Sequence, residues 1–293
     1  MIPLLVGAAA IWGISNVADA ESNAKAANRI NKEAAELAQN AHENVNNAHD
    51  NMMNVLDELG ETKHRTSIAI GIAGDFIQDI TQKIRQENDT KSMKELEEAG
   101  IYENILTQMH TLSQQAQEIV IDSDKEIDAS ENENAVCVFG ALGGAALGFG
   151  AIAMPAMLLY SFMKSDEAEA AYHEAKTRMD EARVYEERCN NICSLFNAIS
   201  TRGEQIDRLL YGLNKYFVPA VENLSHVVDA YGIDYKNYSM ESKMSVFYSF
   251  QLAQTVKTVV ETSMLQEDWS LNTDIDKTLE IGQKTIQLLS DNG

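Results

Sequence analysis

Residues 135–163 read AVCVFGALGGAALGFGAIAMPAMLLYSFM, a stretch of 29 residues without a charged side chain. A helix needs about 20 consecutive apolar residues to cross a hydrocarbon layer about 30 Å thick. The first 20 residues of the stretch precede Pro155, and a proline kinks or ends a helix. The length therefore predicts a membrane-inserting segment, either one tilted helix with a kink or a tight hairpin of two shorter arms.

Small and large residues of the stretch have different expected roles. Gly140, Gly144 and Gly148 are spaced four apart and would form one stripe on a helix, where another backbone can approach closely. We expect this stripe to pack helices together in lipid, which favours self-association. The side chains expected to enter the membrane are the large apolar ones: Val136, Val138, Phe139, Leu142, Leu147, Phe149, Ile152, Met154, Met157, Leu158, Leu159 and Phe162. The alternative is a hydrophobic hairpin buried in a soluble bundle, either permanently or in one state only.

The chain as a whole is acidic and favours helix. It has 293 residues, a formal net charge of −22 and 3 prolines. Few prolines among many Ala, Glu, Gln, Lys and Leu residues are typical of helical proteins. The negative charge repels phosphate backbones, so nucleic acid is not an expected partner. It also opposes electrostatic docking on anionic lipid, so membrane association must come from burial of apolar side chains.

Apolar residues on both sides of the stretch recur at steps of three and four. From Asp19 to about Gln86 we expect one long helix or two stacked ones. From Ala27 to Leu59 the apolar residues form a heptad seam rich in alanine, which is typical of a helix packed against another. Alanine buries little surface, so such a seam is weak and separates easily. A second long helix is expected from Ser92 to about Val120 and a third from 166 to 217. Two shorter helices are expected at about 240–265 and 275–289.

The predicted fold is all-α. Adjacent long helices joined by short turns fold back on each other, so we expect an elongated, coiled-coil-like antiparallel bundle with the hydrophobic hairpin or transmembrane segment at one tip. The expected parts are an apolar N-terminal segment (1–18), a long-helix pair (19–134), the membrane-inserting segment (135–163), a long return helix (164–218) and C-terminal helices that complete the bundle (219–293).

The apolar N-terminal segment has two interpretations. Residues 1–18 carry no charged side chain and are marginally long enough to span a membrane. They either insert as a second membrane element or pack against the bundle. They lack the Lys or Arg that precedes the apolar part of a secretory signal, so the sequence predicts a retained segment rather than a cleaved signal peptide.

No catalytic or metal-binding motif emerges from the sequence. It contains no nucleophile elbow, no phosphate-binding loop of the Walker type and no H-E-x-x-H. His42 and His49 share a helix face, but a metal site needs more converging ligands. Cys189 and Cys193 are four apart on one helix and are interpreted as core thiols. We therefore expect no enzyme activity, no cofactor and no bound metal.

The order of these parts resembles the cytolysin A family of α-helical pore-forming toxins. In that family a hydrophobic tongue separates the long helices of an elongated bundle, and here the tongue would be VCVFGALGGAALGFGAIAMPAMLLYSF, residues 136–162. The resemblance concerns architecture and implies a soluble form that inserts into membranes and forms pores. The chain departs from the family in its plainly apolar N-terminus and in its alanine-rich seams.

The leading hypothesis is a membrane-inserting protein that permeabilises a lipid bilayer through insertion and oligomerisation of residues 135–163. The protein would be membrane-associated, or soluble and later membrane-bound. One alternative is a constitutively membrane-anchored coiled-coil scaffold or sensor whose helices bind partner coiled-coil proteins. The other is a soluble helical adaptor that buries the apolar segment in a partner.

Overall fold

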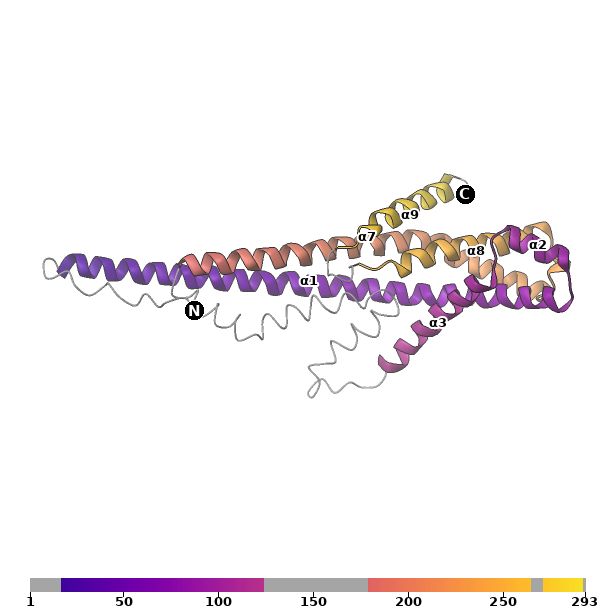
Figure 1. The fold of residues 1–293 in the computed structure, drawn as a ribbon, viewed down its shortest axis with the longest axis horizontal. Coiled ribbons are helices and arrows are strands. Elements are labelled where there is room, and N and C mark those ends of the chain that lie inside the picture. The colour runs from indigo at the N-terminus through magenta and orange to yellow at the C-terminus, as the bar shows by residue number, and fades with distance from the viewer. Residues whose placement is uncertain (1–16, 124–178, 265–270, 292–293) are drawn as a thin grey trace. The chain divides into compact units, whose positions relative to one another are not determined.

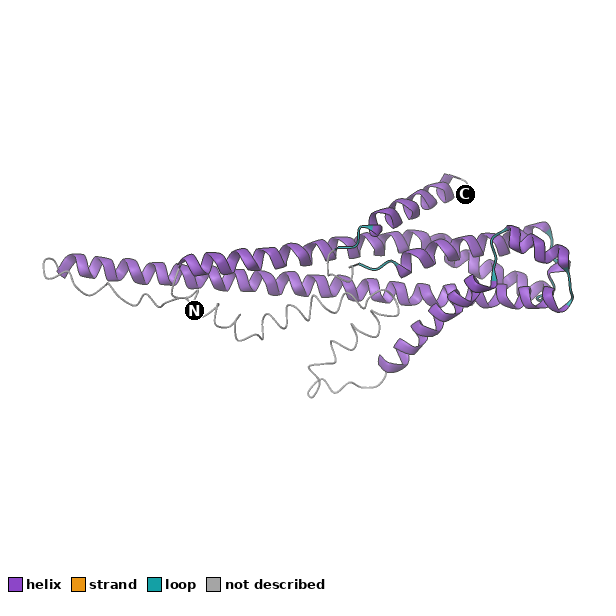
Figure 2. Cartoon of the chain, in the orientation of Figure 1, coloured by secondary structure: helices purple, strands orange, loops and turns teal. Residues whose placement is uncertain are grey.

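The computed structural model describes residues 17–123, 179–264 and 271–291, and these residues are almost entirely helical (Figures 1 and 2). No β-strand occurs within these three ranges, which confirms the all-α class. The helices are α1 (Val17–Gln86), α2 (Thr90–Glu98), α3 (Glu103–Ser123), α7 (Met179–Tyr231), the 3₁₀ turn η1 (Tyr235–Asn237), α8 (Met240–Glu261) and α9 (Asp274–Asp291).

Most residues of the two predicted membrane elements lie outside the described ranges. Residues 135–163 do so entirely, with every side chain expected to enter lipid and with Gly140, Gly144 and Gly148, and so do residues 1–16. Among the residues that the structure does describe, no helix combines the length and the apolar character needed to cross a bilayer.

The prediction of a second long helix is wrong in one respect, because the structure has two helices there, α2 and α3. Gly100 has a φ of 80°, a left-handed conformation that suits glycine at the end of a helix. The Ile101 amide then donates to the Leu96 carbonyl at 3.0 Å, and both side chains are buried. This is the pattern of a Schellman ending, so the chain turns here although the apolar spacing continues.

The third predicted helix, in contrast, extends beyond its expected end. Helix α7 continues through Pro219 to Tyr231, so the boundary expected between residues 218 and 219 falls inside a helix. Pro219 is exposed, and a proline in a helix interior removes one backbone hydrogen bond. The buried Phe217, Val221 and Leu224 on either side keep the helix packed.

The chain divides into two compact units. Unit 1 comprises Met1–Asn46 with Phe162–Cys193, and unit 2 comprises Asn47–Ser161 with Ser194–Gly293. The described core of unit 1 consists mainly of small side chains, and its members are Ala34, Ala38, Ala41, Val45, Ala182, Tyr185 and Cys189. This composition agrees with the alanine-rich seam expected for the first part of α1.

In unit 2, α3 runs antiparallel to α1 and α7 runs parallel to it. His110 Nδ1 of α3 lies 2.8 Å from Asp75 Oδ1 of α1, and Ala116 of α3 has its carbonyl oxygen 3.1 Å from His64 Nε2 of α1. The contacts that fix α7 are Asn51 with Ser200 at 3.4 Å and Asn214 with Thr66 at 2.7 Å. Figure 1 shows α7 beside α1 along this part of the chain.

A glycine allows the close approach of α1 and α3. A Cβ atom added at Gly71 would clash with the Ser113 side chain, and one at Gly74 would lie 3.1 Å from the Met109 Cβ atom. These glycines cost helix stability locally, by up to about 1 kcal/mol each. Here they let two helix backbones come close together, which explains why they stand inside a long helix.

Helices α8 and α9 complete the described core of unit 2. Helix α8 is antiparallel to α7, because Ser245 bonds Asn223 at 3.0 Å and Ser249 bonds the Ala220 carbonyl at 2.8 Å. Helix α9 runs parallel to α7, with Asp276 beside Arg202 and Gly282 against Leu209. The C-terminal end of α8 therefore lies beside Lys63, in the interior of α1, and next to the N-terminal half of α9.

Candidate functional site

A lysine occupies the interior of unit 2. Lys63 of α1 is 0% exposed, although its neighbours along the packed face of the helix, Leu59 and Ile70, are apolar. Its Nζ atom donates a hydrogen bond to the Thr262 carbonyl at 3.2 Å, and Thr262 is the residue that caps the C-terminus of α8. The last carbonyls of a helix lack partners within it and carry partial negative charge. Lys63 thus caps α8 from another helix.

Further polar side chains extend this contact across the helices of unit 2. Thr262 Oγ1 lies 3.1 Å from Thr278 Oγ1 of α9, and Asn214 Nδ2 of α7 donates to Thr66 Oγ1 at 2.7 Å. We call Lys63, Thr66, Asn214, Thr262 and Thr278 the Lys63 junction. Within the described residues, the Asn214 Oδ1 atom is buried and has no hydrogen-bond partner. The junction therefore places an amine, an amide and hydroxyl groups together in the core of unit 2.

Burial sets the protonation of the lysine. It lowers the pKa of Lys63 from 10.5 to about 7, because the protein interior solvates an ammonium ion poorly. On α7, Asp207 has a buried Oδ1 atom without a hydrogen-bond partner among the described residues.

The burial of Lys63 limits the chemistry that is open to the junction. A general base or nucleophile must reach its substrate, and the Lys63 side chain is 0% exposed. An ionisable amine inside a core costs free energy whenever it carries its charge. The arrangement joins α1 to the C-terminal end of α8 through Lys63, and joins α8 to α9 through Thr262 and Thr278.

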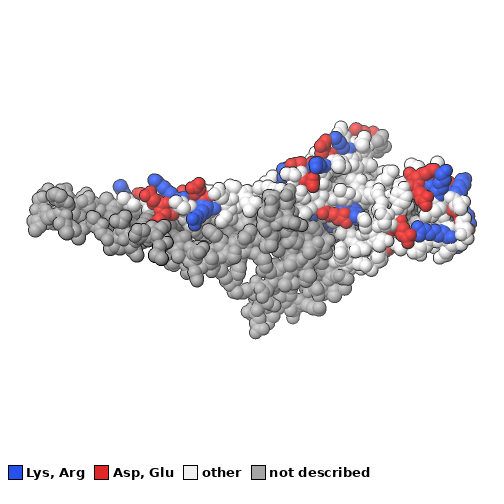
Figure 3. Space-filling view, in the orientation of Figure 1, with Lys and Arg blue, Asp and Glu red and all other residues white. Residues whose placement is uncertain are grey.

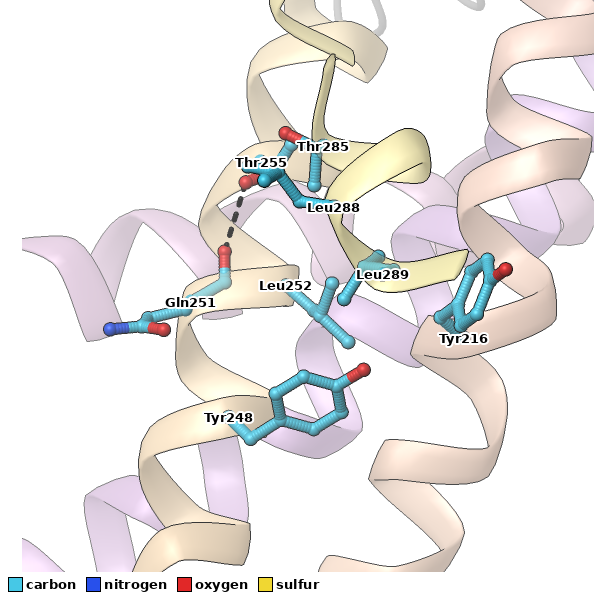
Figure 4. A pocket seen from close by; sticks show the side chains of 8 residues that line it. All are labelled: Tyr216, Tyr248, Gln251, Leu252, Thr255, Thr285, Leu288 and Leu289. Carbon is cyan, nitrogen blue, oxygen red and sulfur yellow. Dashed lines mark hydrogen bonds between the residues drawn. The ribbon is translucent and has the colours of Figure 1, made fainter. Parts of the chain in front are cut away.

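A cavity of about 500 Å³ lies between α7, α8 and α9 in unit 2 (Figure 4). Its lining is apolar and phenolic with a few neutral polar groups: Tyr216, Tyr248, Gln251, Leu252, Thr255, Thr285, Leu288 and Leu289. None of the described residues that line it is charged, and Leu288 is 64% exposed. The C-terminal half of α9 is therefore incompletely packed against α7 and α8.

The histidines and cysteines considered in the sequence do not converge. His42 Nδ1 lies 3.1 Å from the Tyr185 hydroxyl in unit 1, whereas the His49 ring packs edge-on to Phe196 in unit 2. Burial raises the pKa of the Cys189 thiol to about 11 and also raises the pKa of Cys193, which keeps both thiols protonated. No group of three possible metal ligands is found among the described residues.

The described charged side chains are mixed in sign on the face that Figure 3 shows. Many of the ion pairs join exposed residues four apart in one helix, such as Arg29–Glu33 and Lys284–Glu280. Water and salt screen pairs of this kind, so they contribute little to stability. They are solvated helix faces, as the sequence indicates for its many carboxylates.

Sequence reasoning missed Lys63, although a signal was present. The steps of three and four that end at Leu59 continue through Lys63 and Thr66 to Ile70, Ala73 and Ile77. Every one of these later residues is buried. If the seam had been continued at steps of three and four whatever the residue type, it would have placed Lys63 in the core.

Comparison of the chain with protein-family models, with curated proteins and with solved structures finds no match.

Proposed function

We propose that this protein inserts into lipid bilayers and permeabilises them by insertion and oligomerisation of residues 135–163. The observation that carries the proposal is the run of 29 residues without a charged side chain. Such a run exceeds the roughly 20 residues that a membrane-spanning helix needs. In water its exposure would be unfavourable by about 25 cal/mol for each Å² of apolar surface.

The described helices support a protein that rearranges. The core of unit 1 is built largely from alanine, and removing a methyl-sized group from water contributes only about 0.8 kcal/mol. Helices packed through an alanine-rich seam separate at a lower free-energy cost than helices packed through leucine-rich seams.

The proposal assigns a part to each predicted element. The long helices form an elongated bundle that carries the apolar segment, and the segment enters the hydrocarbon layer. Gly140, Gly144 and Gly148 then pack neighbouring copies, as close helix packing in lipid favours small residues. This course of events is the one that the resemblance to the cytolysin A family implies.

Dye release from vesicles tests the proposal. Protein purified without detergent is added to vesicles of zwitterionic lipid, since a net charge of −22 disfavours anionic lipid. We expect dye release together with conversion of soluble protein into a vesicle-bound oligomer. Protein found only in membranes and extracted only by detergent would favour a permanent anchor. Protein that stays soluble and releases no dye would contradict insertion and favour the adaptor.

A further inference from the structure

We propose that the cavity between α7, α8 and α9 is a binding site for a neutral amphiphile, a molecule with an apolar body and an uncharged hydroxyl head group, such as a fatty alcohol. The cavity lies within unit 2. The site is a property of the protein in water and does not rest on the function proposed above.

The size and the lining of the cavity suit a small molecule with an apolar body. Cavities that bind small molecules usually have volumes of about 300–1,000 Å³ and mostly apolar linings, and this one has a volume of about 500 Å³. Leu252 of α8 is buried at the cavity, and Leu288 and Leu289 border it from α9 (Figure 4). The rings of Tyr216 and Tyr248 add further apolar surface. Hydrocarbon that fills this space removes both its own surface and that of the lining from water, which is favourable.

The packing of α9 on α7 defines one boundary of the cavity. A Cβ atom added at Gly212 of α7 would lie 2.6 Å from Ile286 Cδ1 of α9. One turn earlier on α9, a Cβ atom added at Gly282 would lie 2.7 Å from Leu209 Cδ1 of α7. These close contacts seat α9 on α7, and Leu289 on the adjoining face of α9 borders the cavity. The cavity therefore has a boundary that helix packing holds in place.

Uncharged hydrogen-bonding groups lie at the same cavity. Thr255 and Thr285 use their hydroxyls within their own helices, donating to the backbone carbonyl four residues earlier at 3.1 and 3.0 Å. The hydroxyls of Tyr216 and Tyr248 take part in no hydrogen bond with another described residue. Burial and the neighbouring Tyr216 raise the pKa of Tyr248, so its hydroxyl stays protonated and able to donate at neutral pH. The two phenols are therefore suited to bind a hydroxyl head group.

The charge of the lining decides between head groups. The chain has a net charge of −22, yet none of the described residues that line the cavity is charged. The lysines next to two lining residues have other partners, because Lys215 Nζ lies 4.7 Å from the centre of the Tyr211 ring and Lys284 pairs with Glu280. An ionised head group would lose hydration here without gaining an ion pair. A hydroxyl exchanges its hydrogen bonds with water for bonds with the phenols, so an alcohol is favoured over a carboxylate.

Equilibrium dialysis of the full chain against radiolabelled decanol, without detergent or vesicles, tests the assignment. We expect saturable binding with a Kd on the order of 100 µM or below. Decanoate has a chain of the same length and an ionised head group, and it should bind at least about ten-fold more weakly. Decanol should also slow amide hydrogen exchange in α9, because a ligand that binds the packed helix stabilises it.

Two variants locate the bound decanol. Thr255→Phe places a ring in the cavity from a half-buried position and should abolish the binding. The double variant Tyr216→Phe with Tyr248→Phe keeps both rings and removes both hydroxyls, so it should weaken decanol binding about ten-fold. Tyr211→Phe is the matched control, because Tyr211 is an exposed tyrosine of α7 outside the cavity lining, and it should bind as the wild type does.

A wild type that binds no decanol would overturn the assignment, and so would unchanged binding by a folded Thr255→Phe protein. Equal binding of decanoate would overturn the neutral class of ligand. Circular dichroism shows whether each variant is folded, and the double phenylalanine variant decides if Thr255→Phe does not fold. Vesicle leakage is measured separately: decanol binding as predicted without leakage would reject the proposed function and leave the site intact.

Discussion

Replacing Leu142 and Leu147 together with aspartate is expected to reduce the rate of dye release from vesicles at least about 100-fold. Both residues lie in the uncharged stretch, and both belong to the side chains proposed to enter lipid. An aspartate near the centre of a membrane-spanning helix costs about 2.5–3.5 kcal/mol, so two cost about 5–7 kcal/mol. Initial rates of dye release at equal protein concentration measure the effect.

A double methionine variant at the same two positions provides the control, since methionine remains apolar and should retain release close to the wild-type rate. Helical content measured by circular dichroism shows whether each variant is folded. Undiminished leakage by a folded aspartate variant would mean that these side chains do not enter hydrocarbon. If the segment were instead a permanent part of a soluble core, the aspartates would unfold the protein and the wild type would release no dye.

The second large effect concerns the pH dependence of stability. Lys63→Met is expected to be more stable than the wild type at about pH 7, by on the order of 1–4 kcal/mol, as when buried ionic groups are replaced by apolar ones. This difference should shrink as the pH rises. Between the folded pKa of about 7 and the ordinary value of 10.5, the unfolded wild type binds one more proton than the folded form. Its stability therefore rises with pH by up to about 1.4 kcal/mol per unit.

Below about pH 7 the lysine is protonated in both states, so its contribution no longer changes with pH. Urea unfolding of both proteins at several pH values measures the difference. Burial raises the pKa of Cys189 to about 11 and of Tyr238 to about 12, so these groups lower stability at high pH. They are present in both proteins and cancel in the comparison. A difference that stays constant with pH would show that Lys63 is not a buried, titrating amine.

Local patterns in the sequence were sufficient to predict most described helices. One long helix or two stacked ones were expected from residue 19 to about 86, and the structure has the single helix Val17–Gln86. The last helix was expected at 275–289 and spans Asp274–Asp291. Helix periodicity and capping residues are properties of neighbouring residues, so a single sequence contains them. The side chain of Ser239, for example, accepts a hydrogen bond from the Ser242 amide at the start of α8.

Features that depend on tertiary contacts were not predictable in the same way. The turn at Gly100 depends on Ile101 finding a buried position beside Leu96, and apolar spacing alone does not reveal this. The close approach at Gly71 depends on where α3 returns along α1. The burial of Lys63 depends on the end of α8, which lies about 200 residues later in the chain. Long-range pairing of this kind is not encoded in local periodicity.

The proposed membrane insertion is tested most directly by measuring whether residues 135–163 enter the hydrocarbon layer. A single cysteine at position 147, in a variant whose Cys137, Cys189 and Cys193 are replaced by alanine, carries an environment-sensitive fluorophore. After addition of vesicles, we expect the emission of the fluorophore to shift to the blue. Lipids that carry a quencher deep in their acyl chains should then reduce the emission strongly, whereas iodide in the aqueous phase should not reduce it. Emission that stays unchanged on vesicle addition and insensitive to the lipid quencher would contradict insertion.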